Sequence, residues 1–463
     1  MNQDTICAVS TAPGAGGIAV IRVSGPEAIS ICNSIFVPRT KGNSVTAQKA
    51  YTLSYGSIYR NGEMIDDVLL ALFRNPHSFT GEDTVEITCH GSVYVQQQLL
   101  QLLIEKGCRS ALPGEYTQRA FLNGKIDLSQ AEAVADLIAS TSAGQHKLAV
   151  SQMRGGFSNE LSKLRNQLLD FTSLIELELD FSEEDVEFAD RSNLKQLASG
   201  IEQLIHKLAD SFSVGNAIKN GIPVAIIGET NAGKSTLLNL LVGEERAIVS
   251  DIHGTTRDVI EDTINISGIN FRFIDTAGIR ETSDTIESLG IERTFKKLEQ
   301  ASIVLWVIDL TSPPELIESL AQVIIPKTEG KHTLLIFNKS DLLSPEALAA
   351  KQQLLSNVPA ERLYISAKQQ NNTELLQQQL LKAASIPELS QNDIIVTNVR
   401  HYEALTKAHE AITRVINGLD QNISGDFLSQ DIRECMHYLG EITGQISNDE
   451  ILENIFGKFC IGK

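Results

Sequence analysis

The sequence is poor in several features that would each point to a particular class of protein. Its six cysteines form no CxxC pair, which argues against a disulfide framework and against a zinc site. It has no run of about 18 apolar residues, and its start, MNQDTICAVS, lacks a basic region followed by a long apolar core. We therefore expect a soluble, cytoplasmic chain without a membrane partner.

Basic residues are also in short supply. Lys and Arg number 39 against 58 Asp and Glu, so the formal net charge is -19. A chain this acidic is a poor candidate for gripping nucleic acid alone, and an RNA substrate would need a basic patch or a basic partner. The length of 463 residues suggests two to four domains.

The stretch Gly228–Ser235, which reads GETNAGKS, has the composition of a phosphate-binding loop. It follows an apolar run at Pro223–Ile227 and leads into the apolar start of a helix at Thr236–Leu241, the context that this motif requires. Backbone N–H groups of such a loop cradle phosphates, Lys234 reaches the β- and γ-phosphates, and the Ser235 hydroxyl is placed to bind Mg²⁺. A glycine-rich turn without a ligand is the alternative, and the flanking strand and helix argue against it.

Two further motifs follow in the order expected of a nucleotide hydrolase. Gly254–Asp258 (GTTRD) lies where a switch loop can bring Thr256 to Mg²⁺ and the γ-phosphate. A predicted strand at Ile269–Ile274 ends in Asp275–Gly278 (DTAG), an arrangement in which the acid ends a strand and Gly278 can donate its N–H to the γ-phosphate.

The next motifs indicate which base is bound. Asn338–Asp341 (NKSD) follows a predicted strand at Thr333–Phe337. The Asp341 carboxylate can accept both the ring N1–H and the exocyclic amine of guanine, a donor pair that adenine does not offer. Ser366–Lys368 (SAK) follows a strand near Leu363–Ile365 and is placed to pack against the base. Together these motifs resemble those of GTPases of the translation-factor-like class.

Residues 1–121 have the pattern of a separate α+β domain. Arg22, Glu86 and Lys125 each lie within apolar sequence, and their spacing alone favours a solvated strand face. Strands are expected at Ile6–Val9, Ile18–Val23, Tyr51–Tyr59, Val68–Phe73 and Thr84–Thr88, and a helix at Tyr94–Ile104.

Residues 122–218 and 385–463 are helical in pattern, with apolar residues at steps of three and four. Neither segment alone has enough amphipathic helices to bury its apolar stripes. We therefore expect one discontinuous all-α domain, with an α/β GTPase domain at 219–384 inserted into it. The acidic run Glu176–Asp190 indicates a solvated face or a docking surface for a basic partner in preference to a metal site.

Motifs outside the GTPase region indicate the family. The chain carries TAPGAGGIAVIRVSG near its start, then SFTGED and PGEYTQRAFLNGKIDLSQAEA, and CIGK at its end. With the GTPase motifs, these stretches resemble the MnmE (also called TrmE) family of bacterial tRNA-modification GTPases across all 463 residues.

The resemblance implies a homodimer that forms through an N-terminal domain with a tetrahydrofolate-binding-like fold. It places Arg22, Glu86, Lys125 and the terminal Lys463 in the folate site, which replaces the solvated-face interpretation. The folate, as a 5-formyl or 5,10-methylene derivative, would supply a one-carbon unit to C5 of the wobble uridine of certain tRNAs.

The resemblance also implies a partner, the FAD-containing protein MnmG (GidA), in a heterotetramer or a larger assembly. The product would be carboxymethylaminomethyl- or aminomethyl-uridine. With a flavoprotein in the reaction, a role for the tail thiol of Cys460 as a nucleophile stays open.

The hydrolytic residues implied by the resemblance are unusual. Many small GTPases carry Gln directly after the DTAG run to orient water, and here that position is Ile279. The resemblance selects Glu287 from the acids just downstream as the catalytic residue. A potassium ion would supply the positive charge that an arginine finger normally adds, and two GTPase domains would have to meet face to face to order its loop. The implied metal ligands are Ser235 and Thr256 for magnesium, and Asn231, Ser250, Ile252 and Thr255 for potassium.

The motifs and the resemblance together give an extended set of GTP-binding residues. These are Asn231, Ala232, Gly233, Lys234, Ser235, Thr236, Ser250, Asp251, Ile252, His253, Gly254, Thr255, Thr256, Asp275, Thr276, Ala277, Gly278, Asn338, Lys339, Asp341, Ser366, Ala367 and Lys368. The alternative function is that of a regulatory switch GTPase in ribosome assembly. Such proteins typically append a KH-like or basic RNA-binding module, and this acidic chain has no GXXG loop in a KH-like context.

Overall fold

The computed structural model describes residues 4–40, 44–180, 191–244, 262–274, 298–385, 394–446 and 449–462. The chain divides into two compact units. Residues 1–138, 152–203 and 404–463 form one unit, and residues 139–151 and 204–403 form the other. The division falls inside helices and not between them, so the domain boundaries expected at 121, 218 and 384 stay predictions. Among the helices that the structure describes, none has the length and hydropathy needed to cross a membrane.

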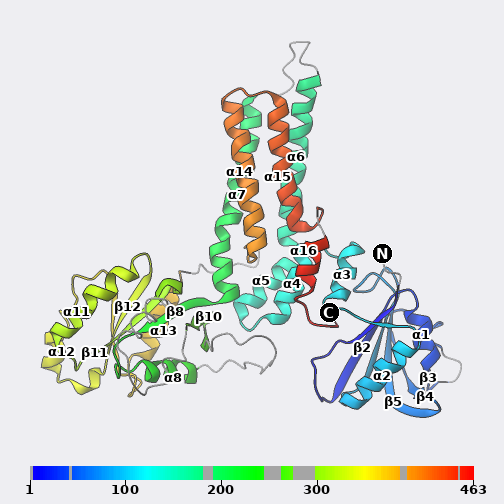
Figure 1. The fold of residues 1–463 in the computed structure, drawn as a ribbon, viewed down its shortest axis with the longest axis horizontal. Helices are drawn as coiled ribbons and strands as arrows, with labels where there is room; N and C mark the ends of the chain where they lie inside the picture. The colour runs from blue at the N-terminus through cyan, green and yellow to red at the C-terminus, as the bar shows by residue number, and fades with distance from the viewer. Residues whose placement is uncertain are drawn as a thin grey trace. The chain divides into compact units, whose positions relative to one another are not determined.

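The N-terminal part of the chain forms a seven-stranded sheet of order β3-β4-β5-β6-β2-β1-β7 (Figure 1). Short β7 pairs with β1 in parallel, and the other neighbours are antiparallel. The strands are β1 Ile6–Val9, β2 Ile18–Ser24, β3 Phe36–Pro38, β4 Thr52–Arg60, β5 Glu63–Phe73, β6 Thr84–His90 and β7 Arg109–Ser110.

One face of this sheet is buried beneath helices α1 (Ala28–Ile35) and α2 (Val93–Glu105). Ile21 and Ile87 are fully buried in that core. Because side chains alternate along a strand, their neighbours Arg22 and Glu86 belong to the opposite face. Part of that second face is covered by helix α3 (Glu115–Leu122), whose Tyr116 packs against β1 in a small core of its own. The rest carries exposed apolar residues such as Leu53, Tyr55 and Leu69.

A second sheet, in the other compact unit, has six strands in the order β13-β12-β11-β8-β10-β9. Only β9 is antiparallel to its neighbour. The strands are β8 Ile222–Ile227, β9 Asp262–Ile266, β10 Ile269–Phe273, β11 Ile303–Asp309, β12 His332–Asn338 and β13 Glu361–Tyr364. The chain leaves β8 first toward β10 and later toward β11, and ligands of open α/β sheets bind at such a reversal of strand order.

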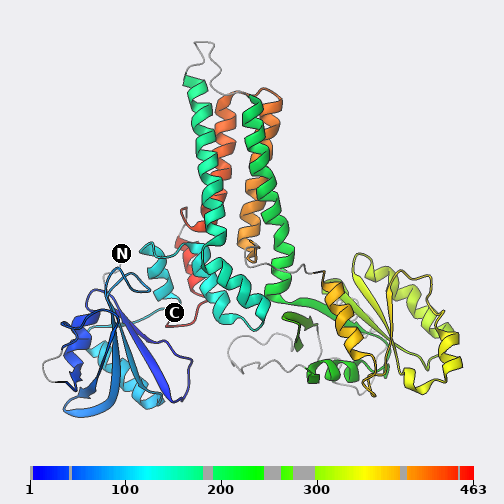
Figure 2. The ribbon, with the colours of Figure 1, turned by 180° about the vertical axis from the view of Figure 1, so that it is seen from behind.

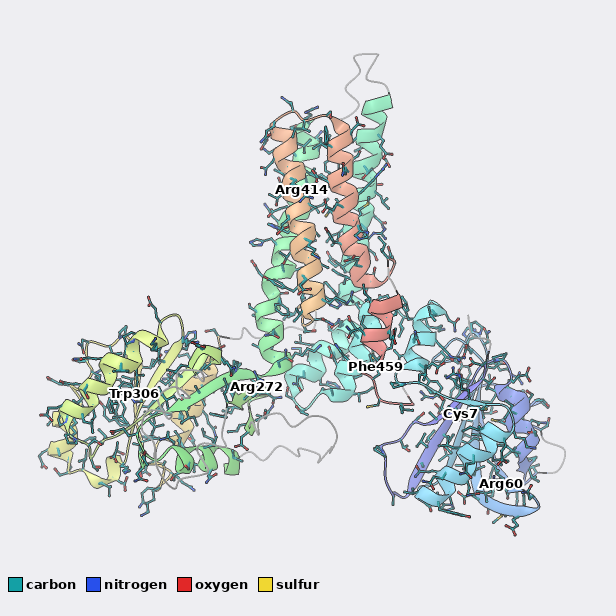
Figure 3. The ribbon with its side chains drawn as sticks, viewed as in Figure 1. Cys7, Arg60, Arg272, Trp306, Arg414 and Phe459 are labelled. Atoms are coloured by element: carbon teal, nitrogen blue, oxygen red, sulfur yellow. The ribbon has the colours of Figure 1, made fainter. Side chains whose placement is uncertain are left out.

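Helices cover both faces of the six-stranded sheet. On one face α8 (Lys234–Glu244) and α13 (Thr373–Ala384) contribute buried leucines to the core. On the other face α11 (Pro314–Ile324) packs over the fully buried Trp306 of β11 (Figure 3). Helix α12 (Pro345–Lys351) is capped by Ser344, whose hydroxyl accepts the Ala347 N–H.

Segments from before and after the six-stranded sheet form one helical bundle (Figures 1 and 2). Ion pairs tie the two segments together within the first compact unit: His409 with Glu202 at 2.6 Å, Lys195 with Asp420 at 2.5 Å, and Arg433 with Glu176. The helices of these two segments of the chain are α4 Leu128–Ala139, α5 Ala143–Met153, α6 Gly156–Asp180, α7 Arg191–Asn220, α14 Val399–Asp420, α15 Gly425–Thr443 and α16 Asp449–Phe456. The expected fold class, with the α/β domain inserted into a discontinuous helical domain, is confirmed.

Candidate functional site

The loop between β8 and α8 has the shape that a phosphate-binding loop needs. Gly228 has φ +145°, and a Cβ there would lie 2.2 Å from the Val307 carbonyl oxygen of β11. Gly233 has φ +98°, and a Cβ there would lie 2.1 Å from the Asn338 amide nitrogen. Only glycine fits either position, because any other residue would clash with the neighbouring strand and would be strained at this φ. The close packing of the loop therefore explains the glycines of the sequence motif.

Lys234 lies across this loop. Its ammonium group donates hydrogen bonds to the carbonyl oxygens of Gly228, at 2.8 Å, and Glu229, at 2.6 Å. Ser235 and Thr236 follow in the first turn of α8, where backbone N–H groups are not used within the helix. The ammonium, the hydroxyls and the helix N-terminus thus gather hydrogen-bond donors and positive potential at one place, which suits a polyphosphate.

Asn338 joins the phosphate loop to the expected base-binding loops. It is buried at the end of β12; its Nδ2 donates to the Ala232 carbonyl at 2.8 Å, and its Oδ1 accepts the Ala367 N–H at 3.0 Å. Ser340 adds a second link, because its backbone N–H and its hydroxyl both donate to the Ile365 carbonyl. The three sequence motifs therefore meet at the carboxyl edge of the sheet.

The exposed residues of this edge fit a base-binding role. Asp341 and Lys368 are both exposed, so their side chains are accessible to a ligand. Lys339 has φ +64° and donates from Nζ to Asp309 Oδ2 at 2.5 Å. Asp309 belongs to none of the motifs identified in the sequence. The available signal was an acidic residue at the end of a buried strand that precedes the NKSD strand.

Asp309 is held as an anion. Burial alone would raise the pKa of its carboxyl, but hydrogen bonds from Lys339 and Thr311 outweigh burial and lower that pKa below its usual value. Thr311 donates to Oδ1 from both its N–H, at 2.8 Å, and its hydroxyl, at 2.7 Å. Each carboxylate oxygen therefore has its own donor.

The structure brings together the expected residues of the phosphate loop, of the NKSD loop and of the SAK loop. Several other expected site residues lie outside the described residues, and for these the assignments stay predictions. They are Ser250, Asp251, Ile252, His253, Gly254, Thr255, Thr256, Asp275, Thr276, Ala277, Gly278, Glu287 and Lys463.

A second candidate site lies on the N-terminal sheet. Arg22 of β2 and Glu86 of β6 occupy directly facing positions, and Arg22 donates from Nε at 2.9 Å to the same Glu86 oxygen that its Nη2 approaches at 2.8 Å. The guanidinium also lies 5.5 Å from the ring centre of Tyr116 and 5.8 Å from that of Phe79. The two charged side chains are only 22% and 26% exposed, so they are half-buried, and a fully solvated strand face does not describe them.

The expected Lys125 lies at a turn that packs beside this pair. Its ammonium donates to the Pro76 carbonyl at 3.0 Å, and Asn123 donates to the Thr80 carbonyl at 2.7 Å. A Cβ at Gly81 would come within 3.2 Å of the Lys125 side chain. The 76–82 turn is therefore in tight contact with the 123–125 segment.

Ion pairs of the buried Arg119 hold the 76–82 turn in place. Arg119 is buried and donates to both Glu82 oxygens at 3.2 Å, to Asp4 Oδ1 at 2.9 Å and to Glu115 at 3.0 Å. Ser24, two residues after Arg22, donates to Glu82 at 2.9 Å. This network fixes the turn relative to β2.

The C-terminal tail runs along the end of β1. Ile461 forms a bridge with Pro113, and the Gly114 N–H donates to the Cys460 carbonyl at 3.4 Å. The Ser10 hydroxyl donates to the Gly462 carbonyl at 3.1 Å. Phe459, just before these residues, packs on Phe456 of α16 with ring centres 5.5 Å apart (Figure 3).

This course brings the tail close to β2, because β1 pairs with the strand that carries Arg22. Cys460 is exposed. Among the residues that the structure describes, no group of three or more His, Cys, Asp or Glu side chains is arranged to hold a metal ion.

The doubly wound sheet, its glycine loop with Lys234 and Ser235, and the Asn338–Asp341 loop braced against that glycine loop define a P-loop GTPase. Comparison with known families extends this conclusion to the whole chain. Residues 5–125 match the family model described as "GTP-binding protein TrmE N-terminus", and residues 128–460 match the model described as "MnmE helical domain". The chain belongs to the MnmE family of tRNA modification GTPases.

Full-length relatives agree with this assignment. The chain is similar to the tRNA modification GTPase MnmE of Bacteroides thetaiotaomicron, with 66% identity over 466 residues and 100% of both chains covered. It is also 56% identical to the protein of the same name in Flavobacterium johnsoniae, again with 100% of both chains covered. Among solved structures, Aquifex aeolicus Era bound to GDP and aluminium fluoride matches 41% of this chain and 66% of its own, at 28% identity and a TM-score of 0.27.

Proposed function

We propose that the protein hydrolyses GTP while it modifies C5 of the wobble uridine of certain tRNAs in the cytoplasm. A tetrahydrofolate derivative, in the 5-formyl or 5,10-methylene form, donates the one-carbon unit, and the FAD-dependent partner MnmG completes the chemistry in a heterotetramer or larger assembly. The product is the carboxymethylaminomethyl or aminomethyl derivative. The observation that carries this proposal is the half-buried Arg22–Glu86 pair beside the docked C-terminal tail.

The chemistry of this pair suits a folate. A carboxylate such as Glu86 can accept two N–H donors from the pterin edge, and cations such as Arg22 and Lys125 can bind the folate's own carboxylates. The Phe79 ring, 41% exposed and 5.8 Å from the Arg22 guanidinium, offers flat apolar surface for the pterin, and the buried Tyr116 ring supports the guanidinium at 5.5 Å. Lys463 follows Gly462, whose carbonyl is bonded to Ser10 at the end of β1.

A homodimer is supported by the open face of the N-terminal sheet. Leu53 is 67% exposed, Tyr55 49% and Leu69 42%, and all three lie on the neighbouring strands β4 and β5. Tyr55 and Leu69 are direct cross-strand partners, so their exposed side chains are adjacent. A contiguous apolar sheet face of this kind is typical of a protein interface, and a second copy of the chain presents the same face.

The GTPase step follows from the donors that the structure places around the phosphate loop. Lys234 and the first turn of α8 bind the phosphates, and the Ser235 hydroxyl and Asn231 amide are the hard oxygen ligands that Mg²⁺ and K⁺ accept. When bound, these cations supply positive charge near the β- and γ-phosphates. We assign Thr256 to magnesium, Ser250, Ile252 and Thr255 to potassium, and Glu287 to the orientation of the attacking water, on the strength of the family assignment.

The hydrolysis cycle can be relayed to the helical part through the β9–β10 hairpin. The turn of that hairpin contacts the start of α5, because the Gly144 N–H donates to the Gly268 carbonyl at 3.3 Å. Asn270 of β10 adds a hydrogen bond to the Thr141 hydroxyl at 3.2 Å. Because β9 and β10 flank the expected switch segments, a movement of those segments would pull on α5 directly.

The test is reconstitution of the modification. Purified protein is incubated with MnmG, substrate tRNA, GTP and methylene-tetrahydrofolate, and the digested nucleosides are analysed by mass spectrometry. We expect C5-modified uridine from the wild type, and a loss of at least about tenfold in rate for Glu86→Gln, because one charged hydrogen-bond acceptor is removed. The matched control is Glu63→Gln, an exposed residue on neighbouring β5. Hydrolysis of GTP with no folate binding and no modified uridine would contradict the proposal and favour a switch role in ribosome assembly.

A further inference from the structure

We propose that Asp309 is a positioning residue for guanine-nucleotide binding, which fixes Lys339 so that the lysine stem forms one wall of the base pocket. The inference rests on the proposed base-binding role of the Asn338–Asp341 loop. It adds a residue that lies 30 positions before Lys339 and belongs to none of the motifs in the sequence.

The sheet places Asp309 beside that loop. Strands β11 and β12 are parallel and end together, with Asp309 directly opposite Asn338. The Leu310 N–H donates to the Asn338 carbonyl at 3.1 Å, which locks the two strand ends in register. Asp309 therefore lies at the end of β11, directly beside the end of β12, which Lys339 follows.

Thr311 holds the Asp309 carboxylate in place independently of Lys339. Its Oδ1 accepts both the N–H and the hydroxyl of Thr311, at 2.8 and 2.7 Å, which leaves Oδ2 for Lys339 Nζ at 2.5 Å. The Asp309 side chain is 13% exposed and that of Lys339 is 29% exposed. An ion pair so little exposed is screened less by salt than a surface pair.

Lys339 needs such an anchor. It has φ +64°, a left-handed conformation that is uncommon for a residue with a long side chain, and it starts the short helix Ser340–Leu342 that contains Asp341. A free lysine side chain samples many rotamers, which costs binding energy when one of them must be selected. With Nζ fixed at the end of β11, the methylene stem is held next to Asp341, the residue expected to bind the edge of guanine.

The loop after Asp309 also reaches the phosphate side. Ser312 donates from its hydroxyl to Glu229 of the phosphate loop at 3.4 Å, and the Ser312 N–H donates to the Asp309 carbonyl at 3.1 Å. Asp309 thus lies at the base of a short loop that contacts the phosphate loop. Its carboxylate acts on the base wall, which GDP and GTP share, so both nucleotides should be affected equally.

The experiment measures nucleotide affinity and dissociation with fluorescent GDP and GTP analogues on the full-length protein. The variants are Asp309→Asn, Lys339→Met, the double variant and Asp341→Asn, with the exposed Glu318→Gln of α11 as the matched control. We expect Asp309→Asn to weaken GDP and GTP binding by the same factor, about fivefold to twentyfold, mainly through faster dissociation. The control should bind as the wild type does.

The double variant separates positioning from a general structural effect. If Asp309 acts through Lys339, then Asp309→Asn costs less than about twofold once Lys339 is already methionine. Equal losses in both backgrounds, or wild-type affinity for Asp309→Asn alone, would overturn the inference. If Lys339→Met and Asp341→Asn both bind GDP as tightly as the wild type, the base-site assignment itself has failed, which is a different result.

Discussion

The phosphate loop offers a sharp test at Gly233, through the substitution Gly233→Ala. The added Cβ would lie 2.1 Å from Asn338 Nδ2, so the amide must move by about 1.4 Å to restore an ordinary contact of about 3.5 Å. That shift breaks its 2.8 Å hydrogen bond to the Ala232 carbonyl and leaves buried polar groups unpaired, at a cost of about 1–3 kcal/mol. Holding alanine at φ +98° costs a further 1–3 kcal/mol or so.

The assay is titration with a fluorescent GDP analogue, alongside the thermal unfolding of the same samples. If about 2 kcal/mol of this cost falls on the nucleotide-binding conformation, GDP affinity falls roughly 25-fold. The control is Gly243→Ala in α8, where a Cβ meets nothing within 4 Å and alanine should stabilise the helix by up to about 1 kcal/mol. Gly233→Ala binding GDP within threefold of the wild type would refute the idea that the Asn338 brace shapes the loop.

Three further outcomes are expected from the N-terminal domain. Glu115→Gln should lower the free energy of unfolding by about 1–3 kcal/mol in urea titrations, because Arg109 and buried Arg119 lose a charged acceptor, whereas the exposed Glu63→Gln should change it by less than about 0.5 kcal/mol. Burial raises the pKa of Glu115, but its hydrogen bonds outweigh burial and lower that pKa, so its contribution is present above the unfolded value of about 4.3 and is lost as the pH falls through the folded pKa. The unfolding free energy of the wild type should therefore drop more steeply below about pH 4.3 than that of the variant, and parallel curves would contradict this reasoning. Leu53→Arg should convert the proposed dimer to a monomer in light scattering without loss of folding, since this side chain is exposed in the single chain, and a persistent dimer would move the interface elsewhere.

Much of the fold follows from local patterns in the sequence. The apolar runs at β1 and β11 and the amphipathic stripe of α6 are long or regular enough to be read directly, and β1 ends where the pattern predicts. Helix α1 escaped detection because it is only eight residues long and no side chain caps its start. Strands β3 and β7 have three and two residues, too few for any alternation to appear.

Strand ends were harder to place than strand centres. Strand β5 begins at Glu63, five residues before the predicted Val68. The early part of the strand carries acidic residues, among them Asp66, which is buried because it accepts the His90 backbone N–H at 2.8 Å and contacts the His90 ring. A buried acid with a partner on another strand cannot be distinguished by spacing from an acid in a loop.

For the candidate sites too, the sequence predicts contiguous motifs but not the contacts between distant residues. The phosphate and base motifs are contiguous stretches, so the sequence names their residues, but the bonds of Asn338 to Ala232 and Ala367 depend on strand order. The pairing of Arg22 with Glu86 depends on the register of β2 against β6, which the spacing of charges does not encode. Asp309 was missed for this reason too, since its partner Lys339 directly follows the next strand of the sheet.

The most direct test of the proposed mechanism compares GTP hydrolysis in KCl and in NaCl at matched ionic strength, with wild type and Asn231→Ala in parallel. We predict a rate that depends strongly on potassium in the wild type and loses that dependence in the variant, because Asn231 is the proposed potassium ligand in the phosphate loop. Equal rates in the two salts for the wild type would contradict potassium in place of an arginine finger, and with it the face-to-face meeting of two GTPase domains.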